Sequence, residues 1–233
     1  MKLGMFMMPS HPPERSPFDA DRWDLECIGL AEDLGFSEVW IREHFTAPWE
    51  PVPTPDILIA RALMQTKSIK LGTGAHLLPF HHPVELAHRV AYLDDLAQGR
   101  YMFGIGSGGL MSDHELFNVD MQASEHRDMT RESLEIILKI LENKGPSEYK
   151  GKFWSFKIPD PDEDHYGGDQ GALGKVFIGP YQKPHPPIGV AAASPGSQTL
   201  RIAGEGGYIP LSLGLNALSL TVAHRPGYLG RGH

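Results

Sequence analysis

The residues with the clearest chemical potential are Glu43 and His44, which follow the apolar segment SEVWIR. Imidazole gains and loses a proton near neutral pH, so a histidine at a strand end suits general acid–base catalysis. Enzymes with an α/β barrel place their catalytic groups at the carboxyl ends of the strands. A lone histidine also occurs as an ordinary structural side chain, so a catalytic and a structural role both stay open.

A second feature is the small-residue segment Gly72-Thr73-Gly74-Ala75, inside an expected strand. Glycine in a strand interior costs conformational entropy and commonly marks the close approach of a ligand or of another backbone. The segment therefore predicts either a surface for a flat ligand or a tightly packed layer of a barrel. These two interpretations are about equally supported.

Two further turns could bind a ligand. Ser194, Gly196 and Ser197 begin an expected helix, where hydroxyls and free N–H groups suit a phosphate, although an ordinary serine cap fits equally well. Residues 104–109 match G-x-G-x-x-G, but no glycine-packed helix follows and the motif belongs to the fourth βα unit, which disfavours a dinucleotide fold. Ser107 lacks the context of a hydrolase nucleophile.

Composition limits the classes of function. The net charge of −8, with scattered basic residues, disfavours nucleic-acid or anionic-membrane binding. The first ten residues contain too short an apolar run for a signal peptide or a membrane span. No metal is expected, because H-E-x-x-H is absent and the pair His81-His82 has no helical partner four residues on.

The single cysteine fits a reducing cytoplasm, which is the expected location. Cys27 lies at helical spacing with Trp23, Leu30 and Leu34, so we expect this set to form the core face of a helix.

Regularly spaced elements position these candidates. Strands are expected over residues 3–8, 37–42, 69–76, 101–105, 187–191 and 207–211, and helices over 19–34, 57–66, 84–97, 126–142 and 197–203. The first four strands begin 32 to 34 residues apart, and this alternation with helices predicts a parallel sheet with right-handed crossovers. Residues 148–156 predict a hairpin and residues 159–174 an exposed loop.

Together these segments resemble the bacterial luciferase-like flavin monooxygenases, and closely the luciferase alpha-chain branch. The resemblance covers about residues 1–216 and rests on KLGMFMMPSHPPE, GFSEVWIREHF, LGTGAHLLPFHHPVELAHRVAYLDDLAQGR, MFGIGSG and VAAASPGS. It implies an α/β fold, a TIM-type (β/α)8 barrel, of which about six of the eight strands are legible here. Residues 1–216 would form one incomplete barrel domain with an insertion at 106–186, and residues 217–233 an irregular tail after a truncation.

The resemblance also implies a mechanism and its residues. Reduced FMN, supplied by a separate NAD(P)H:flavin reductase, would react with O2 to oxygenate a small apolar substrate, and a homodimer is a further expectation. The family's catalytic histidine corresponds to His44, and its unusual cis peptide to Gly74-Ala75. Cofactor binding would involve Glu43, Thr73, Gly74, Ala75, Gly106, Ser107, Ser194, Gly196 and Ser197, and the substrate pocket Met7, Met8 and Phe80.

One departure from the family pattern concerns the phosphate. The luciferase branch has an arginine just after the fourth strand, where this chain has Ser107, so the phosphate would rely on residues 194–197. The expected function is an FMN-dependent monooxygenase. The alternatives are a deazaflavin-dependent hydride-transfer enzyme on the same barrel and a truncated, non-catalytic remnant.

Overall fold

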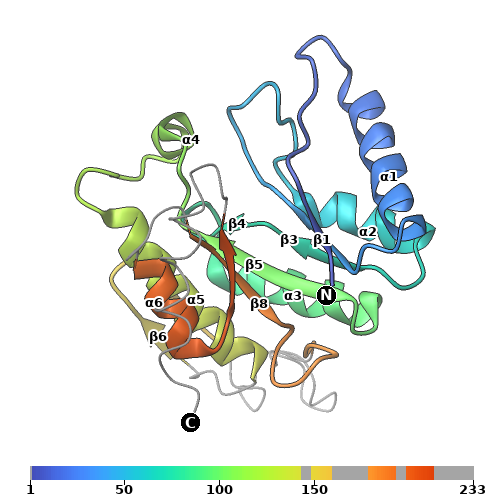
Figure 1. Ribbon diagram of the computed structural model, residues 1–233. Coiled ribbons are helices and arrows are strands. Elements are labelled where there is room, and N and C mark those ends of the chain that lie inside the picture. The colour runs from blue at the N-terminus through green and yellow to red at the C-terminus, as the bar shows by residue number, and fades with distance from the viewer. Residues whose placement is uncertain (1, 143–147, 159–177, 193–197, 213–233) are drawn as a thin grey trace, which may run out of the picture.

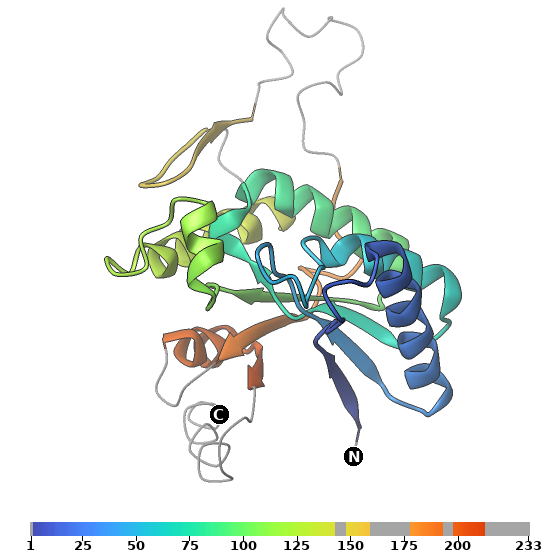
Figure 2. The same cartoon turned by 90° about the horizontal axis from the view of Figure 1, so that it is seen from above.

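The computed structural model describes residues 2–142, 148–158, 178–192 and 198–212. Within these ranges one parallel sheet has the order β1-β2-β3-β5-β8-β9, with β4 pairing to β5. Its strands are β1 (Gly4–Met7), β2 (Glu38–Ile41), β3 (Lys70–Thr73), β4 (His76–Leu77), β5 (Tyr101–Gly106), β8 (Ile188–Ala192) and β9 (Ile209–Ser212). The sheet curls into half of a barrel, as Figure 2 shows.

Helices cover the convex face of this sheet (Figure 1). They are α1 (Pro17–Asp33), α2 (Pro55–Gln65), α3 (Pro83–Ala97), α5 (Glu125–Leu141) and α6 (Gln198–Gly206). The short helix α4 (Met111–Leu116) and the 3-10 helix η1 (Leu78–Phe80) follow the ends of β5 and β4. The predicted hairpin is confirmed as β6 (Glu148–Lys150) paired antiparallel with β7 (Ser155–Lys157). The predicted α/β fold class and the alternation of strands and helices are confirmed.

The third predicted strand is divided into β3 and β4, separated by Gly74 and Ala75. The last predicted strand begins later than expected because α6 continues to Gly206, and Gly207 follows with a positive φ of 67°. Helix α4 was not predicted. The 159–174 loop and the 217–233 tail lie outside the described residues, and the single domain over residues 1–216 stays a prediction.

Local sequence signals fix most helix ends. Helices α2 and α3 begin with proline, which has no N–H to leave unpaired in a first turn. Gly35 follows α1 with φ +81° and Gly99 follows α3 with φ +88°. The predicted start of α1 at Asp19 or Asp21 was late, because the Ser16 hydroxyl accepts a hydrogen bond from the Asp19 amide at 3.1 Å and caps the helix earlier.

The predicted core face of α1 was wrong. Trp23, Leu30 and Leu34 are 54%, 57% and 68% exposed, and Cys27 is only partly buried. The face that packs on the sheet instead carries Ala20, Leu25, Ile28 and Ala31. Helix α1 thus packs through this second set of apolar side chains, and Trp23, Leu30 and Leu34 lie on another face.

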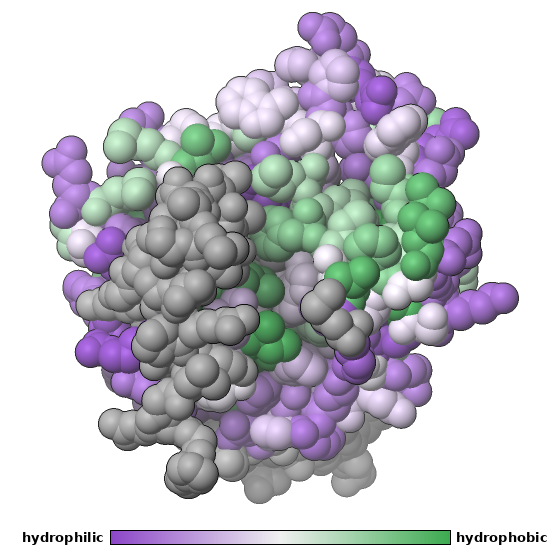
Figure 3. Space-filling view, viewed as in Figure 1, coloured by the Kyte–Doolittle hydropathy of each residue, from purple (hydrophilic) through white to green (hydrophobic). Residues whose placement is uncertain are grey.

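The two end strands, β1 and β9, lie on the same side of the curl (Figure 2), and in the described part of the chain each pairs along one edge only. Figure 3 shows apolar residues gathered near the centre of the face seen in Figure 1 and toward α1. Among the described residues, no helix has the length and apolar character needed to cross a membrane.

Candidate active site

Three small residues, Ala75, Gly106 and Ala191, lie together at the carboxyl ends of the strands, and we call them the floor. A Cβ atom added to Gly106, at the end of β5, would meet the Cβ atoms of Ala75 and Ala191 at 3.4 and 3.5 Å. Ala191 belongs to β8, so three strand ends contribute to this floor. The peptide bond Gly74–Ala75 is cis, as predicted from the resemblance. Leu77 Cδ2 would lie 3.6 Å from the same Cβ added to Gly106, so the floor consists of small residues packed closely beside one leucine.

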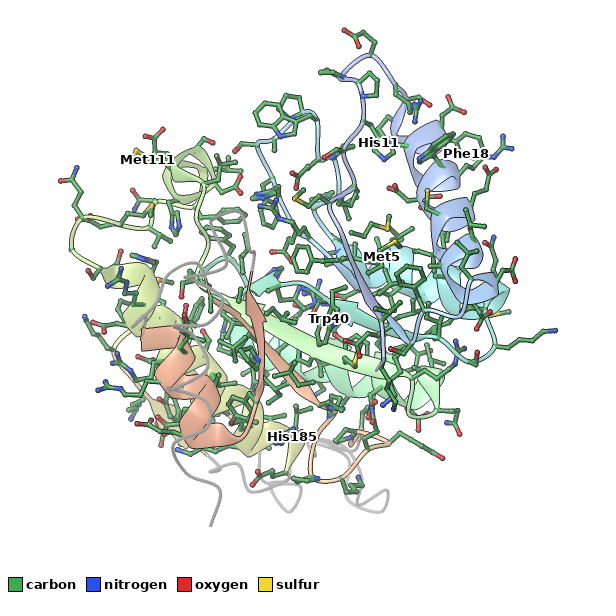
Figure 4. The ribbon with its side chains drawn as sticks, in the orientation of Figure 1. Met5, His11, Phe18, Trp40, Met111 and His185 are labelled. Atoms are coloured by element: carbon green, nitrogen blue, oxygen red, sulfur yellow. The ribbon has the colours of Figure 1, made fainter. Side chains whose placement is uncertain are left out.

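Deeper in the sheet, the glycines serve packing. Trp40 of β2 lies on the concave side of the sheet (Figure 4). A Cβ on Gly72 would lie 2.6 Å from its ring, and a Cβ on Gly189 would lie 2.7 Å from it. A Cβ on Gly74 would likewise lie 2.9 Å from the Trp40 Cβ. Of the two interpretations of the small-residue segment, Gly72 and Gly74 therefore support the packed barrel layer, and only Ala75 at the strand end remains for a ligand.

The Thr73 side chain also holds two strands, β3 and β5, together. Its buried hydroxyl donates to the Gly104 carbonyl oxygen and accepts from the Gly104 amide, both at 2.9 Å. A Cβ on Gly104 would overlap the Thr73 carbonyl oxygen, so glycine is required there. The cofactor-binding role of Thr73 stays a prediction, and the contacts described here join β3 to β5.

His44 lies just past the end of β2, with its side chain 9% exposed. Its Nδ1 lies 3.0 Å from Oδ2 of Asp113, and its Nε2 lies 2.7 Å from Nη2 of Arg42. A guanidinium can only donate, so Nε2 accepts from Arg42 and Nδ1 donates to Asp113. The imidazole is thereby held in one tautomer. Its Nε2 lone pair points at Arg42, a side chain that can turn away. Glu50, 3.3 Å from Arg42 Nη1, offers that guanidinium another partner.

Asp113, in the first turn of α4, is the residue that fixes His44. Its Oδ1 accepts from the amides of Phe45 and Thr46 at 3.2 and 2.8 Å and from the Thr46 hydroxyl at 2.6 Å. Burial acts to raise the pKa of Asp113, but the hydrogen bonds from Thr46 and His44 outweigh it and hold the pKa below 3.8. Asp113 therefore stays an anion that orients the Nδ1–H of His44. It was not predicted from the sequence.

Glu43 points the opposite way from His44, into the protein. Its carboxylate is fully buried: Oε2 lies 2.8 Å from Nδ1 of His76, and Oε1 lies 2.8 Å from Nε2 of His81. Oε1 also accepts from the Leu77 amide at 3.2 Å. Burial acts to raise the pKa of Glu43, but the bonds from His76 and His81 outweigh it and lower the pKa. These contacts join β2 to β4, and direct contact of Glu43 with a cofactor stays a prediction.

His76 lies between two carboxylates. Its Nε2 is 2.8 Å from Oδ1 of Asp56, in the first turn of α2, and its Nδ1 faces Glu43. Burial acts to lower the pKa of His76, but the negative charge of Asp56 and the hydrogen bonds to Asp56 and Glu43 raise it to about 9. Both ring nitrogens of His76 therefore carry protons at neutral pH.

The atoms of Glu43, His76 and His81 lie within 4.8 Å of one another, a spacing that could hold a metal ion. Their hydrogen bonds disfavour this role. Arg89 Nη2 lies 3.2 Å from Nδ1 of His81, and because a guanidinium only donates, the proton of His81 sits on Nε2 and points at Glu43. Arg89 Nε also pairs with Oδ2 of Asp56 at 3.0 Å. The cluster is therefore a set of mutually paired charges.

The residues predicted for a phosphate are only partly described. Ser107 follows β5, and its hydroxyl accepts from the Thr130 hydroxyl of α5 at 3.0 Å. Ser194, Gly196 and Ser197 lie outside the described residues. Phosphate binding by these residues stays a prediction.

The predicted substrate-pocket residues are dispersed. Met7 belongs to the main core, whereas Met8 is 45% exposed and its sulfur lies 3.1 Å from Arg42 Nη1. Phe80 belongs to a separate cluster with Leu77 and Val119. The structure thus does not gather Met7 and Phe80 in one apolar cluster. A cavity of about 170 Å³ lies elsewhere, between α1, residues 51–54 and α2, away from the small-residue floor.

The geometry agrees with comparisons to known proteins. A family model described as luciferase-like monooxygenase matches residues 1–226. A 3,6-diketocamphane 1,6-monooxygenase of Pseudomonas putida is 34% identical over 231 residues, covering 94% of this chain and 60% of the relative. A 2,5-diketocamphane 1,2-monooxygenase of the same organism is 32% identical over 212 residues, covering 91% of this chain and 57% of the relative.

Among solved structures, the oxygenating constituent of 3,6-diketocamphane monooxygenase from P. putida, a type II Baeyer–Villiger monooxygenase in complex with FMN, superposes with a TM-score of 0.87. It is 33% identical, and the match covers 98% of this chain and 61% of that one. The chain thus spans about 60% of the length of the relatives it matches.

Proposed function

This chain belongs to the luciferase-like monooxygenase family, and from that premise we propose that it forms the FMN-binding part of a flavin-dependent monooxygenase. Reduced FMN and O2 would oxygenate a small apolar organic substrate. The observation that carries the proposal is that His44, fixed by Asp113, follows β2, which pairs in parallel with β3, the strand that leads to Ala75 of the Ala75, Gly106 and Ala191 floor.

The strand ends fit a flavin by the space that they leave. A methyl group at Gly106 would already contact Ala75, Ala191 and Leu77, so a larger side chain would have to project beyond them, toward the place that we assign to the ring. The relative of known structure, which was solved with FMN, supports FMN as the ligand. Ser107 and residues 194–197 are the proposed phosphate contacts.

Bound reduced FMN would supply the two electrons that reduce O2, so that one oxygen atom enters the substrate and the other leaves as water. The chain's own contribution is to hold a proton acceptor. His44 Nε2 would take or return a proton during the reaction, while Asp113 holds Nδ1–H and stabilises the imidazolium when it forms. For this step Arg42 must turn from Nε2, and Glu50 is the neighbour that can receive it.

The proposed partners follow from the same assignment. A separate flavin reductase would deliver reduced FMN, since the relative of known structure is described as an oxygenating constituent. The names of the diketocamphane relatives support a cyclic, apolar substrate bearing a carbonyl group. A homodimer remains part of the proposal.

Formation of an oxygenated product tests this function. The purified chain is mixed with photoreduced FMN, O2 and a cyclic ketone, and the oxygenated product is quantified against His44→Ala and against His88→Gln. His88 is a suitable control because, within the described part of the chain, its ring bonds the Val84 carbonyl oxygen alone, one turn away on α3. We expect product from the parent and from His88→Gln but little from His44→Ala. Reduction of the ketone by a reduced deazaflavin in place of oxygenation with FMN, or no product with either cofactor, would refute the proposal.

A further inference from the structure

Five ionisable side chains from separate parts of the chain converge beneath the strand ends. Glu43 follows β2, Asp56 lies on α2, His76 on β4, His81 follows η1 and Arg89 lies on α3. The side chains of Glu43 and His76 are 0% exposed, and those of Asp56 and His81 are 9% and 10% exposed. Neighbouring Tyr101 of β5 is buried as well. These groups form no part of the proposed proton transfer, yet all except Arg89, whose side chain is 27% exposed, are largely removed from water.

The charges within this group balance. Glu43 and Asp56 are anionic, Arg89 is cationic, and His76 carries a proton on each ring nitrogen because each faces a carboxylate oxygen at 2.8 Å. His81, which accepts from Arg89 and donates to Glu43, is neutral. His76 is thus the central cation, and its loss would leave two buried carboxylates with one cation between them.

Stability alone is a weak reason for such an arrangement, because buried ion pairs replaced by apolar side chains often leave a protein equally stable. Its place in the chain gives another reason. Glu43 immediately precedes His44, and His76 immediately follows the cis Gly74–Ala75 segment. The Glu43–His76 bond therefore joins the backbone that carries the proton acceptor to the backbone that forms part of the floor.

We propose that His76, by bridging Glu43 and Asp56, is a positioning residue that fixes the spacing between His44 and the Gly74–Ala75 segment, which contributes Ala75 to the floor. The inference rests on the proposed function. His76 does not touch the substrate or the flavin; it sets the geometry of the groups that do.

The replacement His76→Gln removes the charge and leaves a side chain that reaches one carboxylate instead of two. We expect the folded variant to lose about 10²-fold in kcat or in FMN affinity, the usual scale for a displacement of about 1 Å at a reacting centre. Adding Glu43→Gln restores charge balance, so the double variant should lie closer to the parent than His76→Gln does. His88→Gln serves as the matched control on α3 and should match the parent.

The experiment begins with the parent protein, without cofactor. Nitrogen-15 NMR of its histidines at pH 8 should show His76 with protons on both ring nitrogens, slow to exchange with water. A single protonated nitrogen would overturn the inference whether or not the chain is an enzyme. FMN affinity, from quenching of flavin fluorescence, and kcat are then measured for the parent and the three variants.

The outcomes separate the two proposals. A parent that binds no FMN would refute the proposed function, and the positioning role with it. A parent that binds FMN and turns over, with His76→Gln equal to His88→Gln, would overturn the positioning role alone. A selective loss in folded His76→Gln, with recovery in the double variant, would support it.

Discussion

Raising the pH should destabilise the fold through His76. The pKa of His76 is about 9 in the folded protein and 6.5 in the unfolded chain, so the folded state binds the extra proton between these values. Its stabilising contribution is therefore fully present below pH 6.5 and is lost as the pH rises through about 9. At 1.36 kcal/mol per pKa unit, the rise from 6.5 to about 9 corresponds to roughly 3 kcal/mol.

Urea unfolding of the parent and of His76→Gln at several pH values between 6 and 10 measures this contribution. The burial-raised pKa of the Cys27 thiol and the surface lysines affect both proteins alike, so the difference between their unfolding free energies isolates His76. That difference should shrink by up to roughly 3 kcal/mol over the range, a large part of a typical domain stability of about 5–15 kcal/mol. A difference that stays constant with pH would refute a protonated, bridging His76.

Further predictions concern turnover, stability and self-association. His44→Ala should lower oxygenation by about two to four orders of magnitude with the circular dichroism spectrum unchanged, the usual contribution of a general base, and unchanged turnover would exclude His44. Asp113→Asn should lower kcat by about 10²-fold with little change in urea midpoint, because the Nδ1–H of His44 loses its anionic partner; an unaltered kcat would contradict this. Gly72→Val should destabilise the protein by about 1–3 kcal/mol in urea, because its Cβ would lie 2.6 Å from Trp40, whereas Gly29→Ala, in open space on α1, should not. Sizing at increasing protein concentration should reveal self-association through the edges of β1 and β9, and a monomer at every concentration would count against it.

Local periodicity was enough to predict the sheet. Near-continuous apolar strands separated by helices of similar length permit few arrangements other than a parallel sheet, and the observed sheet is parallel. The resemblance placed the cis peptide at Gly74–Ala75, which no periodicity would indicate. Proline at the start of a helix and glycine just after its end also indicated helix boundaries, because these residues act on the backbone within one turn.

The face of α1 shows where periodicity fails. The stripe containing Trp23 and Leu30 has the helical spacing of a core face, yet its large side chains are exposed. The Asp21–Arg61 ion pair marks the side of α1 that meets α2. Which of two apolar stripes meets the sheet is decided by tertiary packing, which the helix sequence alone does not contain.

The site was harder to predict because its contacts span long stretches of chain. Asp113 and His44 form a hydrogen bond although they lie 69 positions apart in the sequence. Asp113 belongs to a six-residue helix, which is too short to show a hydrophobic periodicity. The partners of His76 and Glu43 lie 20 to 38 positions away. The sequence offered one signal for Asp113, namely an acidic residue shortly after β5. Many surface positions also carry acidic residues, so this signal does not single out Asp113.

Binding of FMN by this chain tests the central claim most directly. Purified protein is titrated into FMN and into riboflavin, following flavin fluorescence, with Gly106→Leu to fill the floor and Gly29→Leu as a control in open space. We predict saturable binding with one FMN per chain, weaker binding of riboflavin, and at least a tenfold loss for Gly106→Leu alone. Absence of FMN binding, or equal affinity in Gly106→Leu and the parent, would contradict a flavin site at these strand ends.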